Sequence, residues 1–338
     1  MKILYGVQAT GNGHISRARA MGKYLAQAGV QVDYLFSGRE ESGLFDMQQF
    51  GNFQLKRGLT FVTLNGKVSY WQSVKQASLL QLKHDINSLD VSRYDLILTD
   101  FEPITAHAAR RAGKRSIAIG HQYAFLHKIP MQDANLMTQL VFKHFAPAQT
   151  QLGLHWHHFN QPILPPIIDE TGDHSSVKPQ QVLVYLPFED QQQVISWLKP
   201  LTGYQFSLYG PGLEIGTQGH ISTHPPALAP FKADLASCSY VLSNAGFELI
   251  SEALQLQKRI MVKPLQGQME QHSNALALKQ LNLASTTDEL SSQHIAQWLN
   301  SNQARRSVQY PNVAQAICHW LLQGATDSVA SLSQQLWR

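Results

Sequence analysis

The chain has 338 residues and a formal net charge of +4, and 43% of its residues are hydrophobic while 15% are charged. This composition can bury a sizeable core and excludes a disordered or collagen-like chain. The two cysteines exclude a disulfide framework and suit a reducing compartment. No run approaches 18 consecutive apolar residues and the first residues are too polar for a secretory signal, so we expect neither a membrane span nor a leader.

The length favours two domains, and the charge is divided unevenly between the two halves. Residues 1–165 hold 17 Lys and Arg against 10 Asp and Glu, whereas residues 166–338 hold 10 against 13. A basic half can attract phosphates, anionic lipid or an acidic substrate. The densest basic run, residues 110–115, is also explained by a solvated helix end, where cations suit the helix dipole.

The first half alternates between short apolar runs and helical patterns. The apolar runs are typical of buried parallel strands and cover Lys2–Val7, Val30–Phe36, Leu96–Thr99 and Ser116–Gly120. Helices are predicted over His14–Ala28 and Pro103–Ala112. The second helix begins with a proline, which suits the first helical position.

A proline-rich joint, Gln161–Pro166, separates the halves, and the polar stretch after it predicts a linker. The alternation then restarts. Strands are predicted over Gln181–Leu186, Gln205–Tyr209, Tyr240–Ser243 and Arg259–Val262. Helices are predicted over Asp190–Leu198, Phe247–Leu256, Glu270–Leu281, Asp288–Asn300 and Val313–Leu322.

These elements predict an α/β protein with two doubly wound parallel-sheet, Rossmann-like domains that face each other across a cleft. We expect the first domain over 1–165, a linker over 166–179 and the second domain over 180–310. Residues 311–338 are expected to form C-terminal helices that pack back on the first domain. Ligands bind beyond the carboxyl ends of the strands in such sheets, so the site is sought in the loops there.

The turn after the first predicted strand, Gly11-Asn12-Gly13-His14-Ile15-Ser16, opens a helix. Glycines allow close backbone approach to a ligand, and the helix start offers unpaired N–H groups. The pattern is close to a dinucleotide fingerprint, but Asp33 lies inside a strand pattern and not at its end. A tight strand-to-helix turn explains the glycines equally well. His14 places an imidazole at the cleft, as a general base requires.

Two further strands end in polar side chains at the same expected edge. Asp100 ends one strand and, with His14, supplies the minimum for a base and its orienting partner, although it could instead cap the helix at Pro103. His121 follows the next strand and is a second candidate in the cleft. A core or capping role explains His121 as well.

The second half contains two motifs at helix starts. Ser243-Asn244-Ala245-Gly246-Phe247 follows a strand; Gly246 lets a phosphate approach the helix, and Glu252 could reach a ribose diol. Glu270-Gln271 with Asn274 places a carboxylate and amides where sugar hydroxyls could bind. Ordinary helix capping explains these residues too.

Together the motifs resemble the GT-B glycosyltransferases, especially the branch of the UDP-glycosyltransferases and the peptidoglycan N-acetylglucosaminyltransferase, and within it a poorly characterised bacterial and archaeal group. The Gly11-x-Gly13-His14 turn resembles the loop with the family's catalytic histidine. Ser243-Asn244-x-Gly246 with Glu252 resembles the donor motif with its ribose-binding glutamate. Glu270-Gln271 with Asn274 resembles the pair that holds the donor sugar.

The resemblance implies an inverting, metal-independent glycosyltransferase without a cofactor. It would move a sugar from a nucleotide-diphosphate donor, by resemblance UDP-linked, to a hydroxyl acceptor in cell-surface glycan or glycolipid synthesis. His14 would be the base and Asp100 its orienter, and the helix start at Gly246 would stabilise the leaving diphosphate. The Glu-x7-Glu pattern of retaining members is absent, because Asn244 stands eight residues before Glu252.

Two departures from the family pattern concern the donor phosphates. Asn244 stands where the family often has His or Arg, so one phosphate contact is weaker or has moved. A Gly-rich loop is replaced by Leu186-Pro187-Phe188-Glu189. Donor and acceptor contacts at that loop are therefore not implied by the resemblance.

Three other functions stay open: a nucleotide-sugar 2-epimerase, a dinucleotide-dependent oxidoreductase and a non-catalytic nucleotide-sugar binding protein. No nucleic-acid partner is expected. The cluster His155-Trp156-His157-His158 lacks cysteine or carboxylate partners at metal spacing, so no metal site is assigned to it. We expect a cytoplasmic protein, and the basic first half suggests a lipid-linked acceptor or weak contact with the inner face of the membrane.

Overall fold

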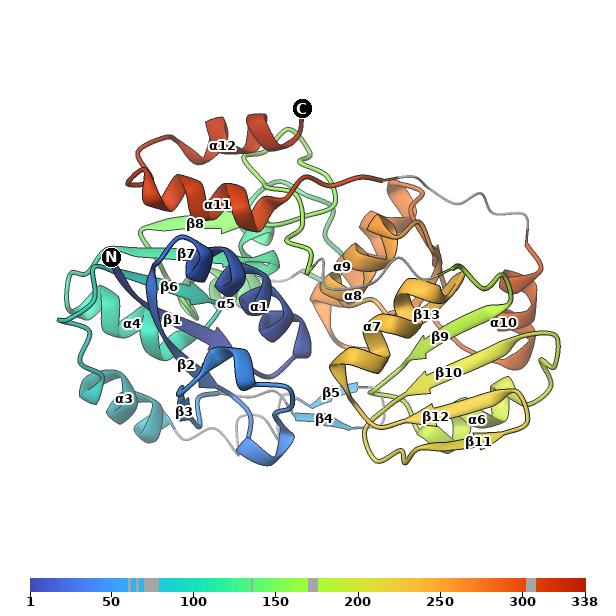
Figure 1. Cartoon of the computed structure of the whole chain (residues 1–338). Coiled ribbons are helices and arrows are strands. Elements are labelled where there is room, and N and C mark those ends of the chain that lie inside the picture. The colour runs from blue at the N-terminus through green and yellow to red at the C-terminus, as the bar shows by residue number, and fades with distance from the viewer. Residues whose placement is uncertain (60–61, 65–66, 70–78, 135, 170–175, 302–307) are drawn as a thin grey trace.

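Two α/β domains lie side by side in the computed structural model, which describes residues 1–59, 62–64, 67–69, 79–134, 136–169, 176–301 and 308–338 (Figure 1). Each domain is built on one mainly parallel sheet with helices on its faces. The expected α/β class with two doubly wound sheets is confirmed. None of the helices in the described ranges is both long and apolar enough to cross a membrane.

The first domain holds a six-stranded parallel sheet in the order β3-β2-β1-β6-β7-β8. The strands are β1 Lys2–Gln8, β2 Gln31–Ser37, β3 Gln54–Lys56, β6 Leu96–Asp100, β7 Ser116–Gly120 and β8 Thr150–Gly153. The helices are α1 Asn12–Gln27, α3 Leu79–Ser88, α4 Pro103–Arg111 and α5 Leu136–His144, with short 3-10 turns η1 Glu41–Gly43, η2 Gln48–Phe50 and η3 His121–Leu126. A small antiparallel pair, β4 Val62–Leu64 and β5 Lys67–Ser69, stands apart from this sheet.

The second domain holds a seven-stranded sheet in the order β11-β12-β10-β9-β13-β14-β15, in which only β11 is antiparallel to its neighbour. The strands are β9 Gln181–Tyr185, β10 Gln205–Tyr209, β11 Gly216–Gln218, β12 Ile221–His224, β13 Tyr240–Asn244, β14 Arg259–Lys263 and β15 Ser285–Thr286. The helices are α6 Gln191–Leu198, α7 Leu228–Ser237, α8 Phe247–Gln255, α9 Met269–Gln280 and α10 Ser292–Leu299.

Both sheets have a topological switch point. In the first sheet the strand order reverses between β1 and β6, and in the second between β9 and β13. At a switch point, the connections that follow two adjacent strands run to opposite faces of the sheet. This leaves a crevice beyond the carboxyl ends of those two strands. The turn at Gly11 and the end of β6 lie at the first crevice, and the turn at Gly246 lies at the second.

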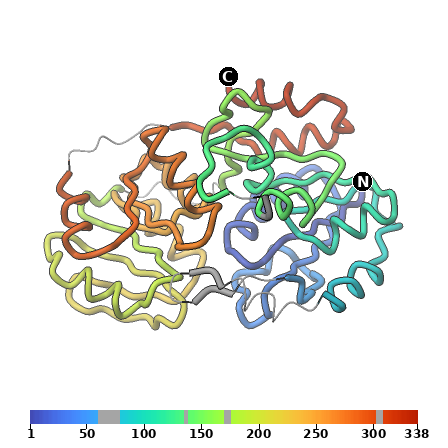
Figure 2. Tube along the Cα trace, turned by 180° about the vertical axis from the view of Figure 1, so that it is seen from behind, coloured from blue at the N-terminus to red at the C-terminus, as the bar shows by residue number. Residues whose placement is uncertain are grey.

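The chain returns to the first domain at its C-terminal end. Helices α11 Val313–Leu322 and α12 Val329–Leu336, drawn in red, lie over the first domain in both views (Figures 1 and 2). The side chains of Ser333 and Trp337 both donate to the carbonyl of Ile163, each at 2.7 Å. The C-terminal helices therefore tie the end of the chain to the segment that leaves the first domain.

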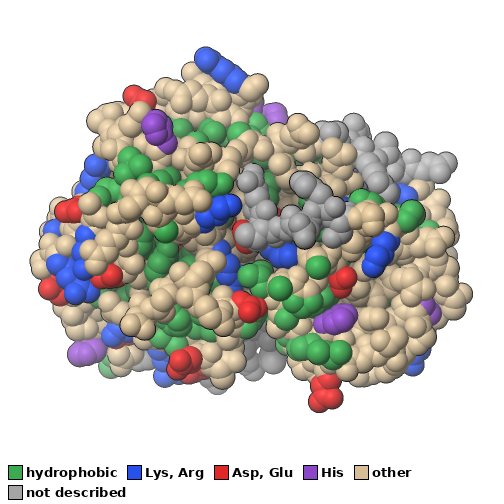
Figure 3. Space-filling model, viewed as in Figure 1, with side chains coloured by type: hydrophobic (Ala, Val, Ile, Leu, Met, Phe, Trp, Pro, Cys, Tyr) green, Lys and Arg blue, Asp and Glu red, His purple; other side chains and the backbone are tan. Residues whose placement is uncertain are grey.

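The basic run at residues 110–115 lies at the end of α4, where its cations meet backbone carbonyls. Arg111 donates to Asn87, Lys114 to Ser92 and Tyr94, and Arg115 to Gly324. On the first domain basic and acidic side chains are interspersed (Figure 3). These contacts fit the alternative in which the run is a solvated helix end.

The strands that the sequence analysis omitted are short. They are β3, β4, β5, β8, β11, β12 and β15, each of two to four residues; β4 and β5 form the small separate pair, and most of the others lie toward the sheet edges. Such segments lack the continuous apolar run that marks a central strand. The cap of α4 is Glu102 and not Asp100: its carboxylate accepts from the backbone N–H groups of Ile104 and Thr105. Asp100 is thus left for another role.

Glu102 provides a test of this local structure. It is fully buried and also accepts from the hydroxyls of Ser37 and Thr105, at 2.7 and 2.6 Å. Glu102→Ala should lower the free energy of unfolding by about 2–4 kcal/mol, because a cap is lost and buried donors stay unpaired. Urea unfolding measures this. Glu40→Ala is the matched control, since Glu40 precedes η1 without a side-chain cap bond; an equal loss in both variants would contradict the assignment.

Candidate active site

His14 and Asp100 meet at the switch point of the first sheet. His14 lies in the first turn of α1, and Asp100 is the last residue of β6, which pairs with β1. The distance between Nδ1 of His14 and Oδ1 of Asp100 is 2.6 Å. Only three residues separate the end of β1 from the start of α1, and the neighbouring strand brings the carboxylate to the same edge.

Arg17 grips the other side of the same carboxylate. Its Nε donates to Oδ2 of Asp100 and its Nη2 to Oδ1, both at 2.6 Å, which is the bidentate geometry of a strong ion pair. Burial alone would raise the pKa of Asp100, but Arg17 and His14 outweigh it, so the pKa lies below its ordinary value. Asp100 is therefore an acceptor, and His14 donates to it through Nδ1–H. Nε2 of His14 makes no hydrogen bond to the described part of the chain.

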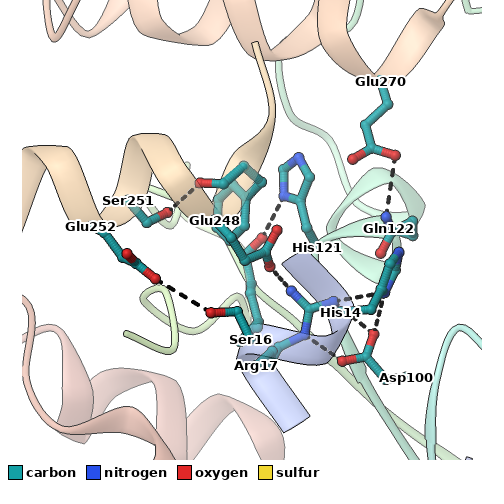
Figure 4. Close-up of polar contacts among 12 residues, drawn as sticks. His14, Ser16, Arg17, Asp100, His121, Gln122, Glu248, Ser251, Glu252 and Glu270 are labelled. Carbon is teal, nitrogen blue, oxygen red and sulfur yellow. Dashed lines mark hydrogen bonds and ion pairs between the residues drawn. The ribbon is translucent and has the colours of Figure 1, made fainter. Parts of the chain in front are cut away.

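Arg17 also reaches the second domain. Its Nη1 forms an ion pair with Glu248, in the first turn of α8 (Figure 4). Only 1% of the Arg17 side chain is exposed. Burial would lower its pKa, but Asp100 outweighs that effect and the pKa is raised. Gly13 lies beside this contact, and a Cβ there would come within 2.5 Å of Oε2 of Glu248.

His121 joins the two domains and is fully buried. Its Nδ1 lies 2.8 Å from the carbonyl of Leu154, and its Nε2 lies 2.7 Å from Oδ1 of Asn274 in α9. The ring stacks on Phe247, with centroids 4.0 Å apart and planes at 4°. Burial lowers the pKa of His121. Because both ring nitrogens face acceptors and the ring is covered, His121 is placed as a bridge between the domains.

Glu252 lies across the interface from Ser16. Its Oε1 accepts from the hydroxyl of Ser16 at 3.5 Å and pairs with Nζ of Lys232 at 2.7 Å. Lys232, in α7, also lies 3.6 Å from Asp169, which follows the first domain. Burial raises the pKa of Glu252, Lys232 partly offsets that effect and Asp169 adds to it. A buried carboxylate with a lysine partner is thus available at the interface.

The donor motif forms the end of β13 and the start of α8. Ser243 and Asn244 are buried, and the amide of Asn244 donates to the carbonyl of Lys263 while its Oδ1 has no partner among the described residues. Gly246 is the residue before the helix, and a Cβ built on it would meet nothing within 4 Å. The position beside Gly246, just before the N-terminus of α8, is therefore free of neighbouring atoms within 4 Å of that Cβ.

Glu270 and Gln271 separate in their roles. Oε2 of Glu270 accepts from the amide of Gln122 in the first domain at 3.2 Å. Oε1 of Gln271 instead accepts from the backbone N–H of Leu265 and is buried. Asn274 donates to the carbonyl of Ala245. Glu270 faces the domain interface, whereas Gln271 and Asn274 hold the loops around α8 and α9 together.

Asn12 forms another contact between the domains. Its amide donates to the hydroxyl of Tyr185 at 3.1 Å, and its Oδ1 accepts from Arg39 at 2.7 Å. The predicted residues of both domains therefore surround one interface. The sequence analysis missed three charged residues there: Arg17, Glu248 and Lys232.

A signal existed for two of these residues. Arg17 follows His14 by three positions, which places both on one face of a helix. Lys232 interrupts the apolar segment Leu228–Ser237, and a lysine buried in such a helix needs an anion. For Glu248 the sequence offers only an acidic residue in the first turn of a predicted helix, which is a common feature.

In the histidine cluster near the linker, the rings of His157 and His158 stack, with centroids 4.6 Å apart. Nδ1 of His155 accepts from the backbone N–H of Trp156, and burial lowers the pKa of His155 well below its ordinary value. Within the residues that the structure describes, no group of three or more His, Cys, Asp and Glu side chains is arranged to hold a metal ion.

The first-domain dyad can accept a proton. Nδ1 of His14 is bound to the carboxylate of Asp100, so the neutral ring has Nε2, on its other side, available as a base. Across the interface, the second domain supplies the N-terminus of α8, and a helix N-terminus favours anions. The arrangement can deprotonate one group while it stabilises negative charge on another.

Comparison with known proteins gives a consistent result. The model of "Glycosyl transferase family 1" matches residues 1–302. No curated protein matches the chain. Among solved structures, the glycosyltransferase SnogD from Streptomyces nogalater is similar with a TM-score of 0.56 at 13% identity, covering 99% of this chain and 96% of SnogD.

Two further structures share this architecture. MurG from Acinetobacter baumannii has a TM-score of 0.59 at 13% identity, with 95% of this chain and 99% of MurG covered. The glycosyltransferase SsfS6 from Streptomyces sp. SF2575, complexed with thymidine diphosphate, has a TM-score of 0.58 at 11% identity, with 99% and 94% covered. The fold is thus the two-domain GT-B fold.

The buried pair of Asp100 and Arg17 gives a pH-dependent prediction. Asp100→Asn should lower the free energy of unfolding by about 3–5 kcal/mol near pH 7, because the buried guanidinium of Arg17 loses its bidentate carboxylate partner. The pKa of Asp100 is lowered in the folded chain, so its stabilisation is present above the unfolded carboxyl pKa and is lost as the pH falls through the folded one. Urea unfolding from pH 7 into the acid range should therefore show the two proteins converging. Asp288→Asn, at an exposed position, is the control and should stay within about 0.5 kcal/mol of the unaltered chain; a constant gap at all pH values would refute the pair.

Proposed function

Because the chain belongs to glycosyl transferase family 1, we propose that it moves a sugar from a nucleoside-diphosphate donor, bound mainly by the second domain, to a hydroxyl acceptor bound mainly by the first. The observation that carries this proposal is the pair of His14 and Asp100 beside the interface, with Nε2 of His14 on the side away from the carboxylate. The switch points of the two sheets support the division of labour between the domains.

The proposed reaction is a direct displacement that inverts the anomeric centre. Nε2 of His14 takes the proton of the acceptor hydroxyl, and the oxygen attacks the anomeric carbon from the face opposite the diphosphate. The bond between that carbon and the diphosphate oxygen breaks, and its electron pair leaves with the diphosphate. Asp100 fixes the tautomer of His14 and stabilises the imidazolium that forms.

Negative charge on the leaving diphosphate would be stabilised by the start of α8. Gly246 leaves space there, and the unpaired N–H groups and the dipole of a helix N-terminus favour anions. This stabilisation supports a mechanism that does not need a divalent metal. Ser243 and Asn244 end β13, directly before the turn that presents these groups.

The nucleoside would be held by Glu252. A carboxylate at this position can accept from both hydroxyls of a ribose, and it now accepts from the hydroxyl of Ser16. Resemblance of the donor motif favours a uridine nucleotide, while the similar SsfS6 binds thymidine diphosphate. Glu270 faces the interface and is proposed to contact the donor sugar. We propose a lipid-linked or glycan acceptor, with weak membrane contact through the basic first domain.

The catalytic role of His14 can be tested directly. His14→Ala should reduce transfer about 10²–10⁴-fold, the usual effect of removing a general base. The affinity for the donor should stay nearly unchanged, since the second domain holds it. The measurement is release of nucleoside diphosphate and formation of glycoside from a panel of UDP- and dTDP-sugars with candidate acceptors.

The control for this variant is His84→Ala, an exposed histidine on α3 of the same domain, which should retain full activity. Full transfer by His14→Ala would remove His14 as the base and move the assignment to His121 or to another reaction class. Conversion of the donor without an acceptor would indicate epimerisation, and nucleotide binding with no turnover would indicate a binding protein.

A second variant tests the nucleoside contact. Glu252→Ala should weaken the binding of UDP or dTDP by about 1.5–3 kcal/mol, the scale of a hydrogen bond to a charged group. Calorimetric titration measures the affinity, and Glu214→Ala, exposed in the same domain, is the control. Unchanged affinity in a folded Glu252→Ala protein would exclude this residue from the nucleoside site.

A further inference from the structure

Arg17 is shared between a carboxylate of each domain. It is held by Asp100 through Nε and Nη2 and meets Glu248 through Nη1. Asp100 is fully buried, while 17% of the Glu248 side chain is exposed. One guanidinium therefore links the end of β6 to the start of α8 (Figure 4).

Within the first domain alone, Arg17 opposes the dyad. Its Nη2 lies 3.1 Å from Nδ1 of His14, and both nitrogens converge on Oδ1 of Asp100. The positive guanidinium offsets the negative charge of Asp100, and it also places a cation beside the imidazole of His14. Both effects disfavour the imidazolium form that a general base must adopt after it takes a proton.

Glu248 brings the compensating charge from the other domain. Its carboxylate lies against Nη1 of Arg17 and beside Gly13, where a side chain would clash with it. With Glu248 in place the guanidinium has two anionic partners. The positive charge of Arg17 then neutralises less of the negative charge of Asp100. The glycine of the first-domain turn is what lets this carboxylate approach the dyad so closely.

We propose that Glu248 is a positioning residue for the dyad: by pairing with Arg17 across the interface, it leaves the charge of Asp100 to His14, so the base is complete only when the two domains meet. This inference rests on the proposed role of His14 as the base. It gives the second domain a part in proton transfer besides holding the donor.

Other titratable groups face this cluster from each neighbouring element. Tyr5 of β1 and Glu270 of α9 both act on the charge of Arg17, and His121 of η3 lies within the field of Arg17 and Glu270. Burial raises the pKa of Tyr5 well above its ordinary value, so Tyr5 is neutral near pH 7, and burial lowers the pKa of His121. Glu248 and Glu270 are the second-domain carboxylates that bear on Arg17.

The test is the pKa of His14 in the full chain, followed by NMR of the histidine ring protons. The chain has 15 histidines, so the His14 signal is identified by its loss in His14→Gln. In Glu248→Gln the pKa of His14 should fall by about one pH unit, because a neighbouring negative charge is removed while Arg17 remains. An unchanged pKa would overturn the proposal.

The control is Asp133→Asn, which breaks another ion pair between the domains, to His272. It should leave the pKa of His14 unchanged, and an equal fall there would show that loosening of the interface, and not Glu248, is responsible. Arg17→Met completes the cycle: without the guanidinium to hold it, Glu248 should lose its influence, so adding Glu248→Gln should then shift the His14 pKa much less. If the two shifts simply add, Glu248 does not act through Arg17 and the proposal fails; if Arg17→Met does not fold, Glu248→Gln and its control decide.

Activity separates this inference from the proposed function. Glu248→Gln should lower kcat about tenfold with a smaller change in the KM for the donor. A fall in the His14 pKa without any transfer by the unaltered chain would leave the electrostatic link intact and refute the transferase. Full transfer that depends on His14, together with an unchanged His14 pKa in Glu248→Gln, would support the transferase and refute the electrostatic link.

Discussion

The burial of a guanidinium between two carboxylates constrains the arrangement of the whole site. Moving a charged group out of water costs far more than one hydrogen bond returns, so Arg17 is stable in the interior only where its anions meet it. The end of β6, with Asp100, must then lie beside the start of α1, and Glu248 must approach from α8. The pairing of β6 with β1 brings the first carboxylate, and contact between the domains brings the second.

The interface combines two kinds of contact. Near the segment that leaves the first domain it is aromatic: His121 stacks on Phe247, and the indole of Trp156 donates to Ser251 at 2.8 Å. Around the dyad it consists of polar pairs, among them Ser16 with Glu252. Aromatic packing is lost at a large cost, whereas water or a ligand can replace partly exposed polar partners. The aromatic part of the interface therefore holds the two domains together, whereas polar pairs such as that of Ser16 and Glu252 can be exchanged for contacts with a ligand.

The sequence predicted those parts of the site that depend on the strand order. His14 and Asp100 follow apolar runs, and a doubly wound sheet brings such strand ends together, so their proximity followed from the pattern alone. Arg17 and Glu248 could not be paired in this way, because the angle at which two domains meet is set by packing across an interface that no local periodicity encodes. Short strands such as β15 were missed for a related reason: two residues carry no period.

The polar groups assigned to substrates satisfy one another in the structure, and this bears on selectivity. Glu252 accepts from Ser16, and Glu270 accepts from Gln122. A molecule that separates such pairs must return equivalent hydrogen bonds to each member, since a buried donor or acceptor left alone costs about 1–3 kcal/mol. A ligand with only an apolar body, or with a diphosphate but no ribose hydroxyls, displaces Ser16 from Glu252 without replacing its hydrogen bond and leaves Lys232 as the partner of Glu252. Discrimination therefore arises from the loss of these internal pairs as much as from the contacts that the substrate gains.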